Sequence, residues 1–403
     1  MAADQWRVLR FGIRLGSRFC FFLRMTPELN RRVYRVGERL CGLLDLLEFF
    51  LREEFFEGGV PRVSDLHLKS GQPARLRVDG ELVPIAGATP LSDEIMEALL
   101  APVLGEKAIA GLRRQPPEDV DASFDWGERA TSFRLNAFVE REGLACVFRV
   151  LPRDIPQPRD LGFPSERVWR EIVDMQQGLV LVTGITGSGK STTIASLLRY
   201  IGRHRAVRII TLEDPIEYIL PNERALVSQR QVGLHVGSFA GGLRSGLRED
   251  PDIIFVGEMR DRETAGLVLT AAETGHLVFS TLHTKDTKGA LSRIVDLFPP
   301  ERFKELCSQL SFSLTWVIGQ KLVTRADGRG RRLAMEILKN TAGMGNLIRN
   351  GVWQQIQSGI ETQAKEGMIT MERSLAKLVE QGEIAPEEAL RHGNGPSIRS
   401  RLA

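Results

Sequence analysis

The sequence predicts an α/β chain in which a smaller α+β domain precedes a larger domain built on a parallel sheet. Three observations lead to this fold class. Short alternating runs typical of strands fill residues 63–150, four prolines then cluster together, and apolar strands alternate with helices from about residue 179. Alternation of apolar strands with helices is the pattern of a parallel sheet. We therefore expect two domains, which a length of 403 residues allows.

Residues 1–37 are predicted to form a basic N-terminal extension. Residues 1–27 hold five arginines against one aspartate, a local charge of +4, so the remaining 376 residues (49 basic, 50 acidic) sum to −1. Such a body lacks the basic bias of a nucleic-acid-binding protein, and we expect no nucleic acid partner. Three interpretations of residues 1–27 stay open: a disordered or non-native extension with Met25 as an alternative start, a surface helix, or a basic amphipathic membrane anchor.

The composition argues against membrane-spanning and disulfide-bonded classes. No run approaches the roughly eighteen apolar residues of a membrane span, because Arg14 and Arg18 interrupt the apolar stretch near the N-terminus. The four cysteines lie far apart and form no Cys-x-x-Cys pair, so neither a zinc motif nor a disulfide framework is indicated. This usage fits the reducing cytoplasm, where we expect the protein to be located.

Residues 38–150 are predicted to form the α+β domain. We expect helices over 38–56 and over Pro90–Leu112, and a hairpin turn at Asp79-Gly80. Four alternating runs predict strands, namely Asp65–Leu68, Arg75–Val78, Ser132–Leu135 and Ala145–Val150.

Two arginines, Arg134 and Arg149, lie on the predicted strands of this domain. A solvated surface is the ordinary place for such side chains. Arginine is also the residue that supplies transition-state charge in phosphoryl transfer, often from a neighbouring subunit. The spacing alone leaves both interpretations open.

A proline-rich linker is predicted at residues 151–166, since prolines stiffen a connector and interrupt helix and sheet. The second domain then spans 167–390, ends in helices beyond about residue 300, and is followed by a basic tail at 391–403. Polar groups follow each of its four apolar runs, which are Leu179–Thr183, Val207–Leu212, Ile253–Val256 and His276–Leu282. Ligands of parallel sheets bind beyond the carboxyl ends of the strands, so we expect these groups to converge on one site.

The first of these runs leads into a complete phosphate-binding P-loop that opens a predicted helix. Backbone N–H groups of such a loop surround phosphates, and the helix N-terminus adds a partial positive charge. In this loop Lys190 would reach the β- and γ-phosphates, and the hydroxyl of Ser191 would hold Mg²⁺. The sequence therefore predicts an Mg²⁺-dependent ATPase that binds ATP through Gly184, Ile185, Thr186, Gly187, Ser188, Gly189, Lys190, Ser191 and Thr192.

Acidic residues and a histidine follow the other three runs. Glu258 comes after an apolar strand downstream of the P-loop, where the residue that activates water and supports Mg²⁺ is expected. Glu213 opens a cluster of three acids, which usually faces water or a cation. His283 closes the last run and is either structural or placed to sense a phosphate. Ser191, Glu213 and Glu258 are thus the candidate metal-binding residues.

These motifs together resemble the secretion ATPase superfamily, and specifically its type IV pilus retraction (PilT/PilU) branch. The resemblance extends over about residues 40–390 and includes several independent motifs in the right order. The motifs are Ser64–Leu68, Arg77–Gly80, Phe133–Phe138, Gly184–Thr192, the acidic box Leu212–Tyr218, the Walker B region Val256–Asp261 and the histidine box Thr274–Thr284.

The resemblance implies a PAS-like first domain and a RecA-like P-loop NTPase domain, assembled as a ring of six with ATP between domains. It implies that Arg134 and Arg149 enter the site and that Glu213, Glu258 and His283 take part in hydrolysis. It also implies pilus retraction and twitching motility, driven through an inner-membrane pilus platform protein at which the ATPase is peripheral, with a paralogous motor ATPase as a further partner.

Other functions remain as alternatives. Pilus-assembly and type II secretion ATPases share the core, but they usually carry a longer N-terminal region and a tetracysteine zinc insert that this chain lacks. An accessory, PilU-like subunit is a third alternative, because Gly343–Asn350 only partly matches the Ala-Ile-Arg-Asn-Leu-Ile-Arg-Glu segment associated with retraction. A RecA-like nucleic-acid translocase is disfavoured by the near-neutral body.

Overall fold

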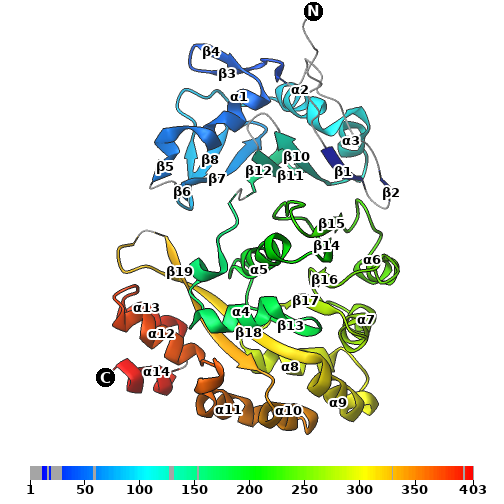
Figure 1. Ribbon diagram of the computed structural model, residues 1–403. Helices are drawn as coiled ribbons and strands as arrows, with labels where there is room; N and C mark the ends of the chain where they lie inside the picture. The colour runs from blue at the N-terminus through cyan, green and yellow to red at the C-terminus, as the bar shows by residue number, and fades with distance from the viewer. Residues whose placement is uncertain are drawn as a thin grey trace, which may run out of the picture. The chain divides into compact units, whose positions relative to one another are not determined.

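A computed structural model describes residues 11–15, 18–19, 30–57, 60–126, 131–151, 154–328, 330–393 and 395–402. The chain divides into two compact units, Met1–Arg153 and Asp154–Ala403, whose helices and strands are drawn in Figure 1. Each unit has its own sheet and its own hydrophobic core.

The N-terminal unit is built on one antiparallel sheet of eight strands in the order β2-β1-β10-β11-β12-β7-β8-β9. These strands are β1 (Phe11–Leu15), β2 (Arg18–Phe19), β7 (Val63–Lys69), β8 (Arg75–Val78), β9 (Glu81–Pro84), β10 (Val120–Trp126), β11 (Thr131–Glu140) and β12 (Gly143–Val150). Two small hairpins accompany the sheet, β3 (Tyr34–Val36) with β4 (Arg39–Cys41) and β5 (Phe56–Glu57) with β6 (Val60–Pro61).

One face of this sheet carries the core of the unit. Alternate residues of β11, such as Phe133 and Leu135, are fully buried, and the ring of Phe133 meets that of Phe50 edge-on at 5.2 Å. The core also takes in the helices α1 (Leu43–Leu47), α2 (Asp93–Leu104) and α3 (Glu106–Leu112). The intervening residues, including Arg134, lie on the opposite face, because successive side chains of a strand point to opposite sides.

The predicted strands and the hairpin of this unit are confirmed. Asp79 and Gly80 form the turn between β8 and β9 with φ angles of 50° and 92°, as an Asp-Gly hairpin turn requires. The helix predictions were too long. Residues 38–56 form strand β4, the short helix α1 and the 3-10 turns Glu48–Leu51 and Glu53–Phe55, while Gly105, at a φ of 79°, separates α2 from α3.

Two short stretches within residues 1–27 are strands, so the surface-helix interpretation does not hold for them. Phe11–Leu15 forms β1, which pairs antiparallel with β10, and Arg18–Phe19 forms β2 beside it. Residues 1–10, 16–17 and 20–29 lie outside the described residues. Phe11, Ile13 and Leu15 alternate with Gly12 and Arg14, and this period of two was the signal that could have found β1.

The C-terminal unit has a seven-stranded sheet in the order β15-β14-β16-β17-β13-β18-β19. Its strands are β13 (Gly178–Thr183), β14 (Arg208–Glu213), β15 (Leu226–Gln231), β16 (Ile253–Val256), β17 (Leu277–Leu282), β18 (Leu314–Thr324) and β19 (Arg331–Lys339). All neighbours pair in parallel except β19, which is antiparallel to β18. This sheet confirms the predicted α/β fold class.

Helices cover both faces of this sheet. One face packs against α4 (Glu166–Asp174) and α5 (Lys190–His204), and the other against α6 (Phe239–Gly246), α7 (Arg262–Glu273), α8 (Thr287–Asp296) and α9 (Phe303–Ser313). Strand β13 shows why both faces of the sheet need a layer of helices. Leu179 and Leu181 pack into the core on one face, and Val180 and Val182 pack into the core on the other. The remaining helices are α10 (Ala342–Arg349), α11 (Ile356–Thr362), α12 (Met371–Glu380), α13 (Pro386–His392) and α14 (Gly395–Leu402).

The prediction of helices alone beyond residue 300 was wrong, because β18 and β19 form a long hairpin at the edge of the sheet. Helix α9 ends at Ser313 and β18 begins at Leu314, so no glycine or proline marks the change from helix to strand. Among the described residues, no helix combines the length and the apolar character that crossing a membrane requires.

Phe133→Ala should destabilise the N-terminal unit by about 3–5 kcal/mol, because it leaves a cavity in the core. Hydrogen exchange of the β11 and β12 amides, followed by mass spectrometry, measures this change in the full chain. Val139→Ala, a change at a partly exposed position of the same strand, should leave exchange nearly unchanged. Equal exchange in both variants would contradict the packing described.

Candidate functional site

The candidate site lies at the carboxyl ends of four neighbouring parallel strands. Strands β14, β16, β17 and β13 are consecutive in the sheet, so the segments that follow them emerge at one edge. Backbone hydrogen bonds join these segments: Gly257 N–H donates to Leu212 O at 2.7 Å, and Met259 N–H donates to Thr281 O at 3.2 Å. The polar groups that follow the four predicted strands therefore share one edge of the sheet.

The P-loop connects β13 directly to α5, whose first residue is Lys190. The Lys190 side chain is almost fully buried, and its ammonium group donates to Gly184 O at 2.8 Å and to Ile185 O at 3.1 Å. Burial lowers the pKa of Lys190, although the nearby Glu217 and Glu258 carboxylates oppose this. The lysine thus bonds to carbonyls of its own loop, and a bound phosphate would offer it stronger, charged acceptors.

Gly184 is required at the start of the loop. Its φ is 154°, and a Cβ built there would lie 2.6 Å from the carbonyl oxygen of Gln320 on β18. Gln320 is fully buried under the loop and donates through Nε2 to Thr193 Oγ1 at 2.7 Å. Gln320 was not among the predicted site residues. Its signal in the sequence is a polar side chain within a strand of apolar residues, since a buried polar group requires a hydrogen-bond partner.

Glu213 is the last residue of β14 and is 8% exposed. Its Oε1 accepts hydrogen bonds from Thr211 Oγ1 at 2.6 Å and from Gln229 Nε2 at 3.0 Å. Burial raises the pKa of Glu213 to about 7, and these hydrogen bonds only partly offset that effect. A buried carboxylate that has neutral donors but no paired cation among the described residues fits a cation-binding role.

Glu258 follows β16 by two residues and contacts two basic groups. The guanidinium of Arg260 lies 2.6 Å from Glu258 Oε1, and His283 Nε2 lies 3.5 Å from Glu258 Oε2. Glu258 is 8% exposed. These contacts place Glu258, which is expected to activate water, beside His283, which is expected to sense a phosphate. Arg260 was not predicted as a site residue, although it lies two positions after the glutamate.

The pKa of His283 is lowered, first by burial and then by the positive charge of Lys190, while Glu258 acts in the opposite direction. The imidazole is therefore neutral at pH 7, where one ring nitrogen donates a hydrogen bond and the other accepts one. His276, by contrast, precedes β17 and lies at its other end, where Nδ1 contacts Ala271 O at 3.0 Å.

Gly257 occupies a position where many P-loop ATPases carry aspartate, and the packing explains the glycine. A Cβ at this position would lie 3.1 Å from Leu212 O and 3.4 Å from a ring carbon of Phe239. A carboxylate side chain would therefore crowd the backbone of β14. Glu258 and Glu213 are buried acids at these strand ends, whereas Asp214 and Glu217 of the acidic loop are exposed.

The acidic loop after β14 is tied to the P-loop helix and to β15. Thr192 and Tyr218 share a hydroxyl–hydroxyl hydrogen bond of 2.8 Å. Gln229 of β15 donates to Tyr218 O at 2.9 Å as well as to Glu213. Gln229 was not among the predicted site residues. Strand β15 was not predicted either, because its half-polar sequence, Leu-Val-Ser-Gln-Arg-Gln, is that of an edge strand.

Arg134 and Arg149 lie in the N-terminal unit, on β11 and β12, and are direct cross-strand partners. Arg149 Nε donates to Asp65 Oδ1 at 2.7 Å. Because the two units are described separately, the structure brings Lys190, Glu258 and His283 together but leaves the place of both arginines relative to them as a prediction.

The donor set suits Mg²⁺, which prefers oxygen ligands and usually keeps several waters and substrate phosphates in its shell. The hydroxyl of Ser191 and the carboxylates of Glu213 and Glu258 are such donors, and the raised pKa of Glu213 marks a carboxylate without a cation. No group of three or more His, Cys, Asp or Glu side chains in the described parts of the chain could hold a metal unaided. A metal at this edge would therefore depend on phosphate oxygens and water.

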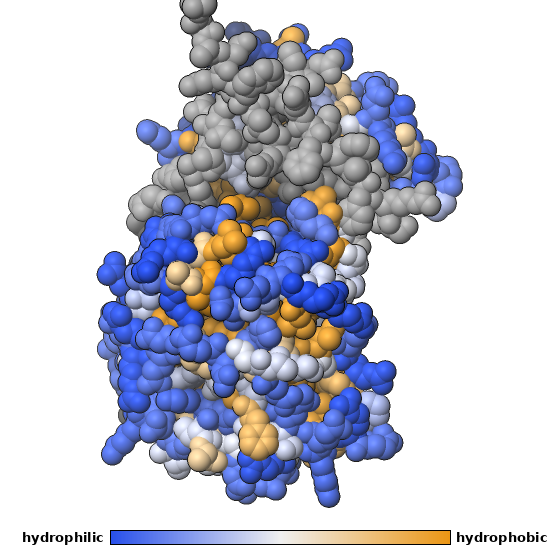
Figure 2. Space-filling model, turned by 45° about the vertical axis from the view of Figure 1, so that its right-hand side comes forward, coloured by the Kyte–Doolittle hydropathy of each residue, from blue (hydrophilic) through white to orange (hydrophobic). Residues whose placement is uncertain are grey.

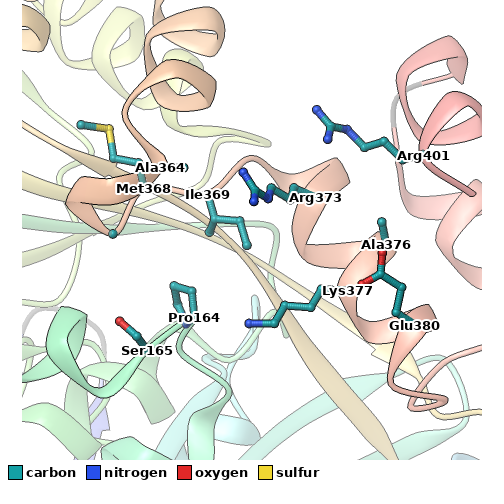
Figure 3. A pocket seen from close by; sticks show the side chains of 11 residues that line it. Pro164, Ser165, Ala364, Met368, Ile369, Arg373, Ala376, Lys377, Glu380 and Arg401 are labelled. Carbon is teal, nitrogen blue, oxygen red and sulfur yellow. The ribbon is translucent and has the colours of Figure 1, made fainter.

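A separate cavity of about 670 Å³ is lined by residues just before α4, by the segment that leads into α12, and by α12 and α14, and it contains none of the site residues. Lys377 extends from α12 towards Pro164, while Arg373 and Arg401 lie nearby (Figure 3). Arg401 is paired with Glu361 at 2.8 Å, and Glu380 also lines the cavity.

Glu213 should give the nucleotide-free and Mg²⁺-free protein a pH-dependent stability. Its pKa is 4.5 unfolded and about 7 folded, so the folded state holds more protons between these values and stability falls as pH rises through them. The full loss of folding stability, about 3 kcal/mol, is present above pH 7. Urea denaturation at pH 5 and at pH 8 measures the difference in stability between the two pH values. Glu213→Gln should remove this difference, whereas Glu217→Gln, a change at an exposed residue, should retain it. Equal pH slopes in wild type and Glu213→Gln would contradict the assignment.

Comparison with known proteins connects this geometry to a family. The model of the family described as "Type II/IV secretion system protein" matches residues 60–391. The uncharacterized protein YggR of Escherichia coli (strain K12) is 43% identical over 80% of this chain and 96% of its own length. The twitching motility protein of Neisseria gonorrhoeae is 48% identical over 70% of this chain and 75% of its own.

Relatives of known name and structure are also similar over nearly their whole length. The type IV pilus retraction ATPase PilT of Pseudomonas aeruginosa (strain PAO1) is 43% identical over 81% of this chain and 93% of its own. The crystal structure of the pilus retraction motor PilT with bound ADP superimposes with a TM-score of 0.79 and 41% identity, covering 88% of this chain and 98% of that one. The chain thus belongs to the type II/IV secretion system protein family, in its branch of type IV pilus retraction ATPases.

Proposed function

We propose that this protein is an ATP-hydrolysing motor that powers type IV pilus retraction, and hence twitching motility. The observation that carries the proposal is the P-loop lysine beside Glu258 and His283 at neighbouring strand ends. The relatives named as retraction and twitching proteins support the cellular role. The ADP bound to the similar PilT structure supports nucleotide binding at the P-loop.

The chain's own residues suggest how hydrolysis proceeds. Lys190 would exchange its bonds to Gly184 O and Ile185 O for bonds to phosphate oxygens, while Thr192 holds the start of α5 against Tyr218. Glu258 would orient the attacking water and accept its proton, and neutral His283 would report on the γ-phosphate through its contact with Glu258. Mg²⁺, held by Ser191, Glu213 and Glu258, would neutralise phosphate charge.

The wider assembly is also part of the proposal. We propose a homo-hexamer with a PAS-like N-terminal and a RecA-like C-terminal domain, in which Arg134 and Arg149 supply charge during hydrolysis. The motor would work in the cytoplasm, at the inner membrane, on a pilus platform protein, with a paralogous motor ATPase as a further partner. The identity and fold shared with PilT support this assignment.

Lys190→Ala should bring ATP turnover to background, because the loop loses its only lysine charge. Glu258→Gln should still bind ATP but hydrolyse it about 100- to 10,000-fold more slowly, since the amide cannot accept a proton. Steady-state phosphate release and equilibrium binding of a fluorescent ATP analogue separate these two outcomes. Substantial turnover by either purified variant would overturn the residue assignments.

The cellular role is tested by deleting the gene and complementing it with wild type or Lys190→Ala. A retraction motor predicts excess surface pili without twitching, rescued by wild type alone. Absent pili would instead place the protein among assembly or secretion ATPases. Normal pili and motility would contradict a retraction role, and rescue by both constructs would show that the cell does not use the ATPase site.

Helix α10 and its C-cap Asn350 contain the segment Gly343–Asn350, whose partial match to the retraction segment is the reason for considering an accessory, PilU-like subunit. Of the residues at which Gly343–Asn350 departs from the retraction segment, Gly343 and Asn350 are exposed, whereas Met344 and Gly345 are buried, so the difference affects both the surface and the core. Beside this helix Phe312 is 71% exposed, with the Arg349 guanidinium 5.0 Å from its ring centre. Hydrophobic side chains form only separate patches on the face shown in Figure 2, where hydrophilic groups dominate. An exposed aromatic ring stacked with arginine suits a protein contact.

Phe312→Asp should therefore abolish rescue of twitching while leaving ATP turnover near the wild-type rate, because Phe312 precedes β18 at the end of the sheet where β13 begins, and the P-loop follows the other end of β13. The control is Leu390→Asp, which alters another exposed hydrophobic side chain, 43% exposed on α13, and should rescue motility. If Phe312→Asp restores twitching fully, this surface has no role in coupling the motor to its partner.

A further inference from the structure

The N-terminal unit carries a row of charged residues across four adjacent strands. Arg77 of β8, Asp65 of β7, Arg149 of β12 and Arg134 of β11 are consecutive cross-strand partners. They lie on the face of the sheet opposite the core, since their neighbours Leu66, Leu76, Leu135 and Phe148 are the buried core residues. We call these four residues the arginine row.

Asp65 lies between Arg77 and Arg149 in the arginine row and is only 1% exposed. Its Oδ1 accepts from Arg149 Nε at 2.7 Å, while its Oδ2 accepts from Ser64 Oγ at 2.7 Å and faces Arg77 Nε at 3.7 Å. Both carboxylate oxygens are therefore engaged. A buried carboxylate costs several kcal/mol unless cations pair with it, so Asp65 constrains where the two guanidinium groups can lie.

Arg149 is held in a way that leaves its terminal nitrogens available. Asp65 binds Nε, the inner nitrogen, and the Arg149 side chain is 65% exposed although its partner is buried. Within the described residues, neither Nη group has a hydrogen-bond partner. Because the guanidinium is planar, fixing Nε also limits the direction of both Nη groups. This orientation suits a fork of two donors for the oxygens of a phosphoryl group.

Arg134 adds a second unpaired cation directly opposite Arg149. Like charges at facing strand positions repel each other and destabilise a sheet. In the parts of the chain that the structure describes, Arg134 has no ion-pair partner, so the row holds three arginines against one aspartate. An anion placed over Arg134 and Arg149 would relieve this repulsion.

We propose that Asp65 is a positioning residue for ATP hydrolysis, which fixes Arg149 through Nε so that its terminal nitrogens, together with Arg134, bind the phosphoryl group in the transition state. Arg77 shares the Asp65 carboxylate and limits its movement. This inference rests on the proposed function, in which both arginines supply charge, and it adds the residue that aims one of them.

Asp65→Asn tests this directly in the full-length protein. The amide keeps the size of the side chain but loses the charge that orients Arg149, so kcat should fall about 10- to 100-fold while KM for ATP changes little. The affinity for ADP with aluminium fluoride, which mimics the transferring phosphoryl group, should fall by the same factor, whereas ADP alone should bind as in wild type. Asp93→Asn removes another hydrogen-bonded carboxylate of the same unit, one that accepts from Leu144 N, and should change stability without changing kcat.

A double-mutant cycle separates positioning from a structural role. If Asp65 acts through Arg149, then Asp65→Asn should have no further effect on kcat in an Arg149→Ala background. Additive losses would overturn the inference while leaving the proposed role of Arg149 intact. Wild-type kcat in Arg149→Ala would overturn both, yet leave the Lys190 and Glu258 assignments untouched. If Asp65→Asn does not fold, Arg149→Lys provides a second test. Lysine keeps a positive charge near Asp65 but lacks the two terminal nitrogens of the guanidinium. A wild-type kcat in Arg149→Lys would refute the proposal.

Discussion

The parallel register of the central strands is the constraint on which the candidate site depends. Strands β13, β16 and β17 are buried along their whole length. A shift of one residue would move every side chain to the other face of the sheet and disrupt both cores. The positions of Glu258 and His283 are therefore set by backbone pairing and core packing, and not by contacts among the site residues themselves. This explains how separate segments of the chain can deliver charged groups to one edge.

The same packing leaves the site electrostatically unfavourable when nothing is bound. Burial raises the pKa of Glu213, and hydrogen bonds from neutral donors offset this only in part, while burial lowers the pKa of Lys190. A protein does not gain stability from such groups, and they persist because the surrounding sheet and helices fix them in place. Binding of phosphate to the lysine, and of a cation to the carboxylate, would offset both desolvation costs.

Much of this arrangement could be read from the sequence because strong local patterns coincide with buried elements. The run Leu179–Thr183 and the loop that follows it identify β13 and the start of α5 without tertiary information. The edge strands could not be found in the same way. β15 is half-polar, and β18 follows α9 without a breaking residue. Nor does any local pattern place Gln229 beside Glu213, since that contact arises only from the pairing of β14 with β15.

The charges of the two units suggest why hydrolysis would require both. The arginine row carries excess positive charge on a sheet that has no P-loop, whereas the P-loop edge holds several acids, one buried lysine and Arg260, whose guanidinium is paired with Glu258. If Arg134 and Arg149 act in the transition state, as we propose, neither unit can complete the reaction alone. The rate of hydrolysis then depends on how the two units are placed, because charge stabilisation weakens steeply when a donor moves by about 1 Å. A motor needs this dependence, since it couples ATP turnover to domain position and allows a mechanical load on one domain to slow the chemistry in the other.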